Sequence, residues 1–472
     1  MGIRYLCLFG LLIGSTSLVA QNQNTFSKAG LLEDLQFLNE VYVQGHSANY
    51  REGAARYTLQ PLLDSVQAHL TDSLTGEQYF FLLRHAIALS GCVHTRLEKA
   101  DALFLDKKTR FPMPFYWIGG QMLVAEQPDN PLPLQMGEPI LEINGLPSSQ
   151  ALAPLLHLFP ADGGGSTLSE WVIRRSGRYY LALALGQPEQ YTVTLADPTL
   201  TLPAATKGAN PAPPVRSFVP EVTFKADDES DFGYLQDSVA VLRLGGFHRR
   251  DMLRYRQVMK TLIEEEIPYL ILDLRANGGG SRMACTQLMR YMATEPFEYT
   301  FVNPPQQKLF PYLNAKGKYY RSMAFLKFGL FNIHPVVSTP WGWGRRYRNR
   351  PAAKTFQGQI TVLTDGLTAS ASAQLVSWLS QQQRALVVGR RPAGGYNGNN
   401  GGSFPLVTLP SSKVQVVIPA FRLVLQADSD QDQGITPHVP VQYTLEDYLN
   451  GQDADLRATL DYWGIDFSGL ED

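Results

Sequence analysis

The chain has 472 residues, enough for two or three domains, and its 44% hydrophobic and 18% charged residues exclude a disordered or fibrous chain. Its formal net charge of -2 provides no overall field that would attract nucleic acid or an anionic membrane, which leaves only local patches open. We therefore expect no nucleic-acid partner.

The first 20 residues have the pattern of an export signal. Arg4 precedes an apolar run from Tyr5 to Ile13, and small and polar residues follow as far as Ala20. This run is shorter than the roughly 20 residues that a membrane-spanning helix needs, and no later segment is long and apolar enough to span. We expect residues 1–20 to be removed and a chain without a membrane span to be exported to the periplasm, the cell surface or the medium. A buried first helix is the alternative.

Residues 24–105 are predicted to form a small helical region, because apolar residues recur there at helical spacing. The recurring residues are Leu32, Leu35, Leu38 and Val41, then Leu62, Leu63, Val66 and Leu70, and then those of Tyr79–Leu89.

Residues 106–200 change to short β-like runs, FYWIGGQMLVA, PILEING and YTVTLAD, separated by turn residues such as those of Gly163–Gly165. A β-rich domain is therefore expected. Residues 201–231 contain many prolines and are predicted to be a linker.

Residues 232–472 alternate between strand and helix patterns. Strands are expected at 239–244, 269–274, 360–363 and 386–388, and helices at 283–292 and 371–379. This repetition predicts a layered α/β core with right-handed crossovers. Residues 296–356, rich in aromatic residues, proline and arginine, have no clear period and are expected to be an insertion. Its basic and aromatic part, Trp341–Arg350, is a lid over a peptide, a surface that holds an acidic or apolar ligand, or a solvated basic loop packed by its tryptophans.

The segment TDGLTASAS contains the first candidate for chemistry. A predicted strand ends at Leu363 and a helix begins near Ser370, so this hydroxyl would stand at the sheet edge beside the free N–H groups of a helix start. There the N–H of Ala371 can face the oxygen that becomes negative during acyl transfer. Spacing alone favours the simpler interpretation, in which Ser370 only caps the helix.

The segment LILDLRANGGGSRM places three glycines after a predicted buried strand. Glycine allows backbone N–H groups to approach a ligand closely, so Gly278 or Gly279 is a candidate for a second oxyanion donor. A tight turn that binds nothing is the alternative. A phosphate loop is disfavoured, because no Gly-Lys-Ser/Thr follows.

A serine nucleophile also needs a base, and spacing cannot choose among the eight histidines, since the partners of a triad meet in space. The cysteines left after the signal, Cys92 and Cys285, allow one disulfide bond but have no metal-ligand spacing. We expect neither a metal nor a cofactor.

Taken together, these segments resemble the C-terminal-processing (tail-specific) serine peptidases, a family that includes the tricorn core protease. LDLRANGGG and TDGLTASAS are followed in family order by RALVVGRRPAGG, LPSSKVQVVIP and QGITP, and the resemblance runs from about Leu31 to Tyr462. It implies a multidomain α/β protein with an N-terminal helical region, a divergent PDZ-like domain and a crotonase/ClpP-like peptidase core.

The resemblance also implies roles for individual residues. Ser370 takes the nucleophile position, with Ala371 and Gly279 as oxyanion donors. GCVHTRL is similar to the family's Asp-Gly-His-Thr segment and makes His94 the general base, while Asp432, with Asp430 as rival, corresponds to the orienting acid. GEPILEING is similar to the carboxylate-binding region of a PDZ module, which makes Gly137 and Ile143, together with Gly278, substrate-binding candidates.

One departure separates two branches of the family. Where the Ser–Lys branch has its base, the segment GRRPAGGYNGNNGG has Gly395 and contains no lysine. A His-dependent arrangement like that of the tricorn core is therefore the better match.

The predicted function is that of an exported serine endopeptidase, which would cleave protein or peptide substrates through a Ser370 acyl-enzyme. The alternative is an inactive ligand- or peptide-binding protein on the same fold. An esterase is less favoured, since no Gly-x-Ser-x-Gly surrounds Ser370. The oligomeric state is not predicted.

Overall fold

The computed structural model describes residues 25–50, 58–98, 100–103, 109–125, 134–206, 208, 210–214, 220–223, 230–302, 308–326, 333–426 and 433–466. The expected export signal, Asp430 and Asp432 lie outside these residues.

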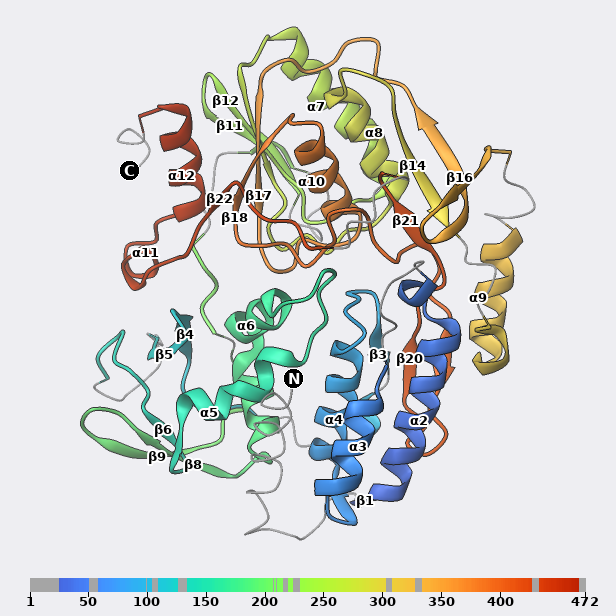
Figure 1. Ribbon diagram of the computed structural model, residues 1–472. Coiled ribbons are helices and arrows are strands. Elements are labelled where there is room, and N and C mark those ends of the chain that lie inside the picture. Colours follow the sequence, from blue (N-terminus) through green and yellow to red (C-terminus); the bar gives the residue numbers. More distant parts are fainter. Residues whose placement is uncertain are drawn as a thin grey trace.

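A seven-stranded sheet forms the centre of one half of the molecule (Figure 1). Its strand order is β10-β11-β12-β13-β17-β18-β22; the strands from β12 to β22 run parallel, and β10 and β11 add an antiparallel edge. The strands are β10 Pro220–Thr223, β11 Asp231–Gln236, β12 Val239–Arg243, β13 Tyr269–Asp273, β17 Gln359–Thr364, β18 Leu386–Gly389 and β22 Val439–Pro440. The parallel order confirms the layered α/β core expected from the sequence.

Helices cover both faces of this sheet, with α7, α8 and α10 on one side and α12 on the other (Figure 1). Alternate side chains of β13 serve the two faces: Leu270 and Leu272 join the main core, whereas Ile271 packs in the cluster that contains Leu460 of α12. Burial on both faces explains why the strand is a continuous apolar run. The helices are α7 Met252–Glu264, α8 Arg282–Met292, α10 Ala371–Gln381, α11 Leu445–Leu449 and α12 Ala454–Trp463.

The predicted insertion is largely built into a second sheet, of order β15-β16-β14-β21. Its elements are β14 Phe297–Val302, a 3₁₀ turn Phe310–Tyr312, α9 Ala315–Phe325, β15 Val336–Thr339, β16 Gly342–Asn349 and, from outside the insertion, β21 Arg422–Val424. The pairing of β14 with β21 joins the insertion to the core.

The N-terminal region is helical, as predicted. Its elements are β1 Thr25–Ser27, α2 Lys28–Gly45, a 3₁₀ turn Ser47–Tyr50, α3 Gln60–His69, β2 Ser73–Thr75, α4 Gly76–Ala88, β3 Arg96–Glu98 and a 3₁₀ turn Ala100–Leu103. Thr75 and Gln78 form a reciprocal capping box at the start of α4, which fixes where that helix begins. Strand β3 leaves the helical region and pairs with β20 (Gln415–Val417), which also pairs with β19 (Leu406–Thr408).

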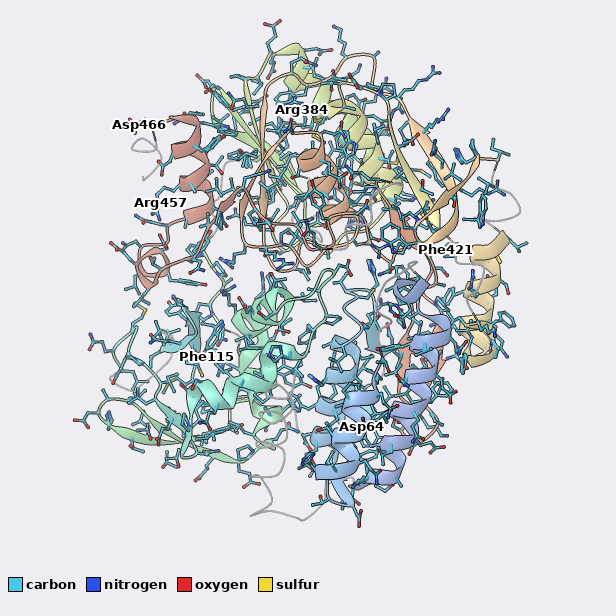
Figure 2. All side chains as sticks on the ribbon, in the orientation of Figure 1. Asp64, Phe115, Arg384, Phe421, Arg457 and Asp466 are labelled. Carbon is cyan, nitrogen blue, oxygen red and sulfur yellow. The ribbon has the colours of Figure 1, made fainter. Side chains whose placement is uncertain are left out.

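The middle region contains strands and one long helix. Its elements are β4 Phe115–Ile118, β5 Gln121–Val124, β6 Glu142–Ile143, β7 Leu146–Pro147, α5 Ser148–Leu152, a 3₁₀ turn Ala153–His157, α6 Thr167–Ala184, β8 Gln190–Thr194 and β9 Thr199–Pro203. The 18-residue helix α6 lies where only short β-like runs were expected. Its Gly177 allows close packing on Phe115, since a β-carbon there would lie 2.8 Å from that ring (Phe115 is labelled in Figure 2).

The PDZ-like character and the domain boundaries stay predictions. The described part of the predicted linker also includes β10, which pairs with β11.

Candidate active site

The two chemistry-bearing segments of the sequence meet at one edge of the central sheet. Strands β13 and β17 are adjacent and parallel, with Asp273 opposite Leu363, so the turns at their carboxyl ends lie side by side. One turn leads to Gly278–Gly280 and the other to Ser370. Ligands of open α/β sheets bind at such an edge.

The side chain of Asp365 connects these two turns. Its Oδ1 accepts a hydrogen bond from the Leu367 N–H (2.9 Å), and its Oδ2 accepts one from the Ala276 N–H (3.0 Å) and one from Trp171 Nε1 of α6 (2.8 Å). Thr368 adds a further link, because its hydroxyl donates to the Leu274 carbonyl at 2.9 Å. The turn that presents Ser370 is therefore held both by the segment after β13 and by helix α6.

Ser370 occupies the N-cap position of α10 without acting as a cap. Its backbone has φ 54° and ψ -121°, and its side chain makes no capping hydrogen bond. A serine that caps a helix usually has extended backbone and accepts an N–H of the first turn. The left-handed φ of a non-glycine residue stores strain, and such strain is concentrated at functional sites. This geometry speaks against the cap interpretation.

The backbone of Gly279 lies close against Ser370. A β-carbon at Gly279, whose φ is +111°, would lie 2.5 Å from Ser370 Cβ and 3.0 Å from the Ala371 nitrogen. Only glycine fits between the two turns at this point.

The possible oxyanion donors differ in their present hydrogen bonds. The Gly279 N–H donates to Asn277 Oδ1 at 2.9 Å, so the expected role of this amide as an oxyanion donor does not agree with the hydrogen bond it makes here. Gly278 is exposed, and a β-carbon on it would meet open space. Ala371 is the first residue of α10, where an amide has no partner within the helix.

One loop, residues 395–404, contacts both Ser370 and His94. Asn399 Nδ2 donates to the Ser370 carbonyl at 3.4 Å. Two residues further on, a β-carbon on Gly401 would lie 2.6 Å from Asn399 Oδ1 and 3.6 Å from His94 Nε2. The structure therefore brings the predicted base and the predicted nucleophile to the same loop, although 276 positions separate them in the sequence.

The His94 ring is buried, with 8% of the residue exposed, and it stacks on Phe404 with ring centres 5.5 Å apart. Neither ring nitrogen has a hydrogen-bond partner among the described residues. Burial, followed by the positive charge of Arg96, lowers the pKa of His94 to about 4. The imidazole is therefore neutral at neutral pH, which is the form that can accept a proton.

Three contacts hold the segment that contains His94. The Val93 N–H donates to Asp162 Oδ1 at 3.0 Å, and β3 continues the segment into the sheet with β20. On the other side Thr95 Oγ1 lies 2.7 Å from His46 Nε2. Because His46 Nδ1 accepts the Ala48 N–H, the Nε2 carries the proton and donates to Thr95. Burial is the largest cause that lowers the pKa of His46, to about 3, so this second ring is also neutral.

The two cysteines of the described chain are free and buried, so the disulfide that the sequence left open is not formed. Burial raises the pKa of Cys92 to about 12, and its Sγ accepts a hydrogen bond from Asn400 Nδ2 at 3.5 Å. Cys285 donates to the Ala371 carbonyl at 3.2 Å and supports the start of α10. Both thiols are protonated at neutral pH and do not compete as nucleophiles.

Two other predicted site residues lie elsewhere. Gly137 packs against the Leu445 side chain of α11, and Ile143 is fully buried in β6. Strand β6 is well separated from the start of α10 in Figure 1. Asp432 lies outside the described residues, and Gly395 pairs with Gly434.

Asn399, Asp365 and His46 were not singled out as functional residues from the sequence. The run NGNN, in a glycine-rich loop, is the one signal that would have drawn attention to Asn399. Nothing in the sequence distinguishes Asp365 from an ordinary turn aspartate.

Comparison with known proteins concerns the sequence and the fold. Residues 238–441 match the sequence model of peptidase family S41. The structure of mature CPAF complexed with lactacystin aligns over 94% of this chain and 99% of that chain, with 14% sequence identity and a TM-score of 0.60. A second structure of mature CPAF gives 14% identity, 94% and 98% coverage and a TM-score of 0.57. At this identity the similarity concerns the fold. No curated protein matches the sequence.

The family match, together with a half-buried, strained serine at the carboxyl edge of the parallel sheet, supports the class of serine-type peptidases. The match of residues 238–441 to peptidase family S41 supports the resemblance of this part of the chain to the C-terminal-processing serine peptidases. Within the described residues, no helix is long and apolar enough to cross a membrane.

Proposed function

We propose that this chain is an exported serine endopeptidase that cleaves protein or peptide substrates, with Ser370 as nucleophile and His94 as general base. The observation that carries the proposal is the conformation of Ser370, which is strained, uncapped and wedged against Gly279. The neutral imidazole of His94, which lies against the loop 395–404 that also contacts Ser370, supplies a proton acceptor.

The reaction runs in two halves. His94 takes the proton of the Ser370 hydroxyl while the oxygen attacks the peptide carbonyl carbon, and the resulting oxyanion is stabilised by the Ala371 N–H. Return of the proton from His94 to the amine releases the first product and leaves an ester on Ser370. A water molecule, deprotonated by His94, then hydrolyses that ester and restores both residues.

The second oxyanion donor is assigned to the N–H of Gly278, the other glycine amide considered from the sequence. The alternative donor, Gly279, is engaged by Asn277. The open space around Gly278 leaves room for a carbonyl oxygen.

Asp432 is assigned as the acid that orients the imidazole, with Asp430 as the next candidate, in line with the His-dependent branch of the family. An acid in this role fixes the tautomer and stabilises the imidazolium that forms. The absence of a lysine from residues 389–402 supports this branch over a Ser–Lys dyad.

The test is the reactivity of Ser370 toward a fluorophosphonate probe, together with hydrolysis of an unstructured protein substrate. Ser370→Ala should abolish both, and His94→Ala should lower both by about 100- to 10,000-fold, the usual value of general acid–base catalysis. Ser372→Ala is the matched control. This serine lies two residues after Ser370, is fully buried, and has a hydroxyl with no hydrogen-bond partner among the described residues. Labelling of Ser370→Ala at the parent rate would refute the assignment.

Export is tested separately, by N-terminal sequencing of the protein recovered from cell fractions. We expect Gln21 as the first residue of an extracytoplasmic chain, because small and polar residues precede Ala20. An intact Met1 in the cytoplasmic fraction would contradict export without affecting the catalytic assignment.

A further inference from the structure

The sequence has a strongly uneven distribution of charge. Between Glu298 and Asp365 there is no acidic residue, while ten lysines and arginines occur. With a formal charge of -2 for the whole chain, the remaining residues therefore carry -12. Charge asymmetry of this size within one chain points to an acidic partner for the basic part.

Helix α9, within this basic part, turns its apolar stripe outward. Tyr319, Tyr320, Met323 and Leu326 follow one another at helical spacing and are 61%, 43%, 46% and 36% exposed. A surface helix normally packs such a stripe on the core. Here an apolar face of about two turns is left for something outside the chain.

The opposite face of α9 attaches the helix to the body of the protein. A β-carbon on Gly317 would lie 2.3 Å from the Leu406 carbonyl oxygen, and the Arg321 guanidinium lies 5.1 Å from the Phe421 ring centre. The helix therefore packs through a glycine and an arginine, at the edge of the molecule (Figure 1; Phe421 is labelled in Figure 2). The outward direction of the stripe is fixed by these contacts.

Two exposed lysines flank the stripe. Lys316 lies 5.7 Å from the ring centre of Tyr320, and Lys318 lies 5.7 Å from that of Phe310, which is 51% exposed. In both pairs the lysine ammonium group lies over an exposed aromatic ring, so cationic and apolar groups share one surface, as they do at the boundary between hydrocarbon and polar headgroups.

The neighbouring β15–β16 hairpin adds apolar side chains of its own. Val336 and Ser338 share a face of β15, and Ser338 pairs with Trp343 of β16, so Val336 and Trp343 point to the same side. They are 51% and 61% exposed. Tryptophan is a typical anchor at membrane interfaces.

We propose that α9 and this hairpin form a membrane-docking surface that lies flat on an anionic lipid bilayer, with the α9 stripe in the headgroup region. Basic residues beside outward apolar and aromatic side chains meet both requirements of such binding, buried apolar area and attraction to anionic lipid. An acidic polypeptide as the partner would match the positive charge, but it would not explain the exposed apolar stripe of α9. A second copy of this chain, docked through the same surface, would bring two positively charged surfaces together. The bilayer is therefore the occupant that accounts for both features.

The test is co-sedimentation of the purified full chain with vesicles of phosphatidylcholine alone or mixed with phosphatidylserine. Binding is expected with the mixed vesicles only. It should weaken from about 0.01 M to about 1 M salt, as the Debye length shortens from about 30 Å to about 3 Å. Each surface lysine contributes about 1 kcal/mol, or about fivefold in affinity, so Lys316→Ala with Lys318→Ala should lower binding about 25-fold. Tyr319→Ser with Met323→Ser should lower it at every salt concentration, by about tenfold or more.

The matched control is Leu253→Ser with Lys260→Ala on α7, two exposed residues of the same kind away from α9. It should bind as the parent does, and so should Ser370→Ala, so that failure of the peptidase assignment and failure of this proposal are distinguishable. Equal binding to both kinds of vesicle, or equal loss in the α7 control, would overturn the proposal. A dimer in sedimentation equilibrium that Met323→Ser dissociates would assign the α9 stripe to self-association instead.

Discussion

Replacing Gly279 by alanine tests whether the close approach of the two turns is needed for reactivity. The new β-carbon would lie 2.5 Å from Ser370 Cβ and 3.0 Å from the Ala369 oxygen, well inside normal contact distance. Its φ of +111° adds backbone strain of about 1–3 kcal/mol, and overpacking adds about 1–3 kcal/mol.

The strain is relieved most easily by moving Ser370, because the turn after β13 is held by Asn277, whose side chain accepts from the Gly279 N–H and donates to the Leu244 carbonyl. A displacement of about 1 Å at a reacting atom costs about 100-fold in rate. We therefore expect the rate of fluorophosphonate labelling of Gly279→Ala, and its kcat/KM on a peptide, to fall at least about 100-fold.

Gly186→Ala is the control for backbone strain. Gly186 has φ +75° at the end of α6, and a β-carbon there would meet nothing within 4 Å. This variant should lose about 1–2 kcal/mol of unfolding free energy in urea while its labelling rate stays that of the parent. If Gly279→Ala unfolds cooperatively and is labelled as fast as Gly186→Ala, the close approach has no part in positioning the nucleophile.

Three further predictions concern charged groups. Because the pKa of His94 is lowered to about 4, kcat/KM should rise with pH through a midpoint near 4, and a midpoint near 6.5 in a pH–rate profile would contradict His94 as the base. His46 and His94 both have folded-state pKa values below the unfolded value of about 6.5, so the unfolded chain takes up protons first as the pH falls. The contribution of the two neutral histidines to the free energy of unfolding is therefore fully present above about pH 7. The free energy of unfolding should be about 2 kcal/mol lower per histidine at pH 5, as measured by urea unfolding at the two pH values. Arg275→Ala should lower the free energy of unfolding by about 3–5 kcal/mol in the same assay, because it leaves buried carboxylates unpaired. The control Arg348→Ala removes an exposed ion pair and should lower it by at most about 1 kcal/mol. Similar losses for both variants would show that the buried ion pairs of Arg275 stabilise the fold no more than an exposed one does.

The strands that carry the site could be predicted from the sequence because their physics is local. β13 and β17 are short apolar runs with glycine-containing turns after them, and α10 begins at Ala371, as expected from the segment TDGLTASAS. Helix α6 was missed because its apolar residues are interrupted by charged and small residues, including Gly177, which owes its place to contact with Phe115.

The proposed base, His94, could not be derived from residue patterns. His94 reaches the site because β3 pairs with β20 and because Asp162 and His46 hold the residues on either side of it. All three contacts join segments far apart in the chain, and only the family resemblance pointed to this histidine. The hydrogen bond from the Gly279 amide to Asn277 is likewise a matter of side-chain conformation that no spacing reveals.

The pairing of β3 with β20 has a consequence for how the enzyme comes into existence. A ribosome completes the segment with the imidazole early and the one with the hydroxyl hundreds of residues later, and strand 415–417, which receives β3, later still. Under the proposed assignment, a nascent or truncated chain that ends before Ser370 contains only the proposed base and cannot cleave other chains. Under the same proposal, hydrolysis requires that β3 and β20, far apart in the chain, have paired.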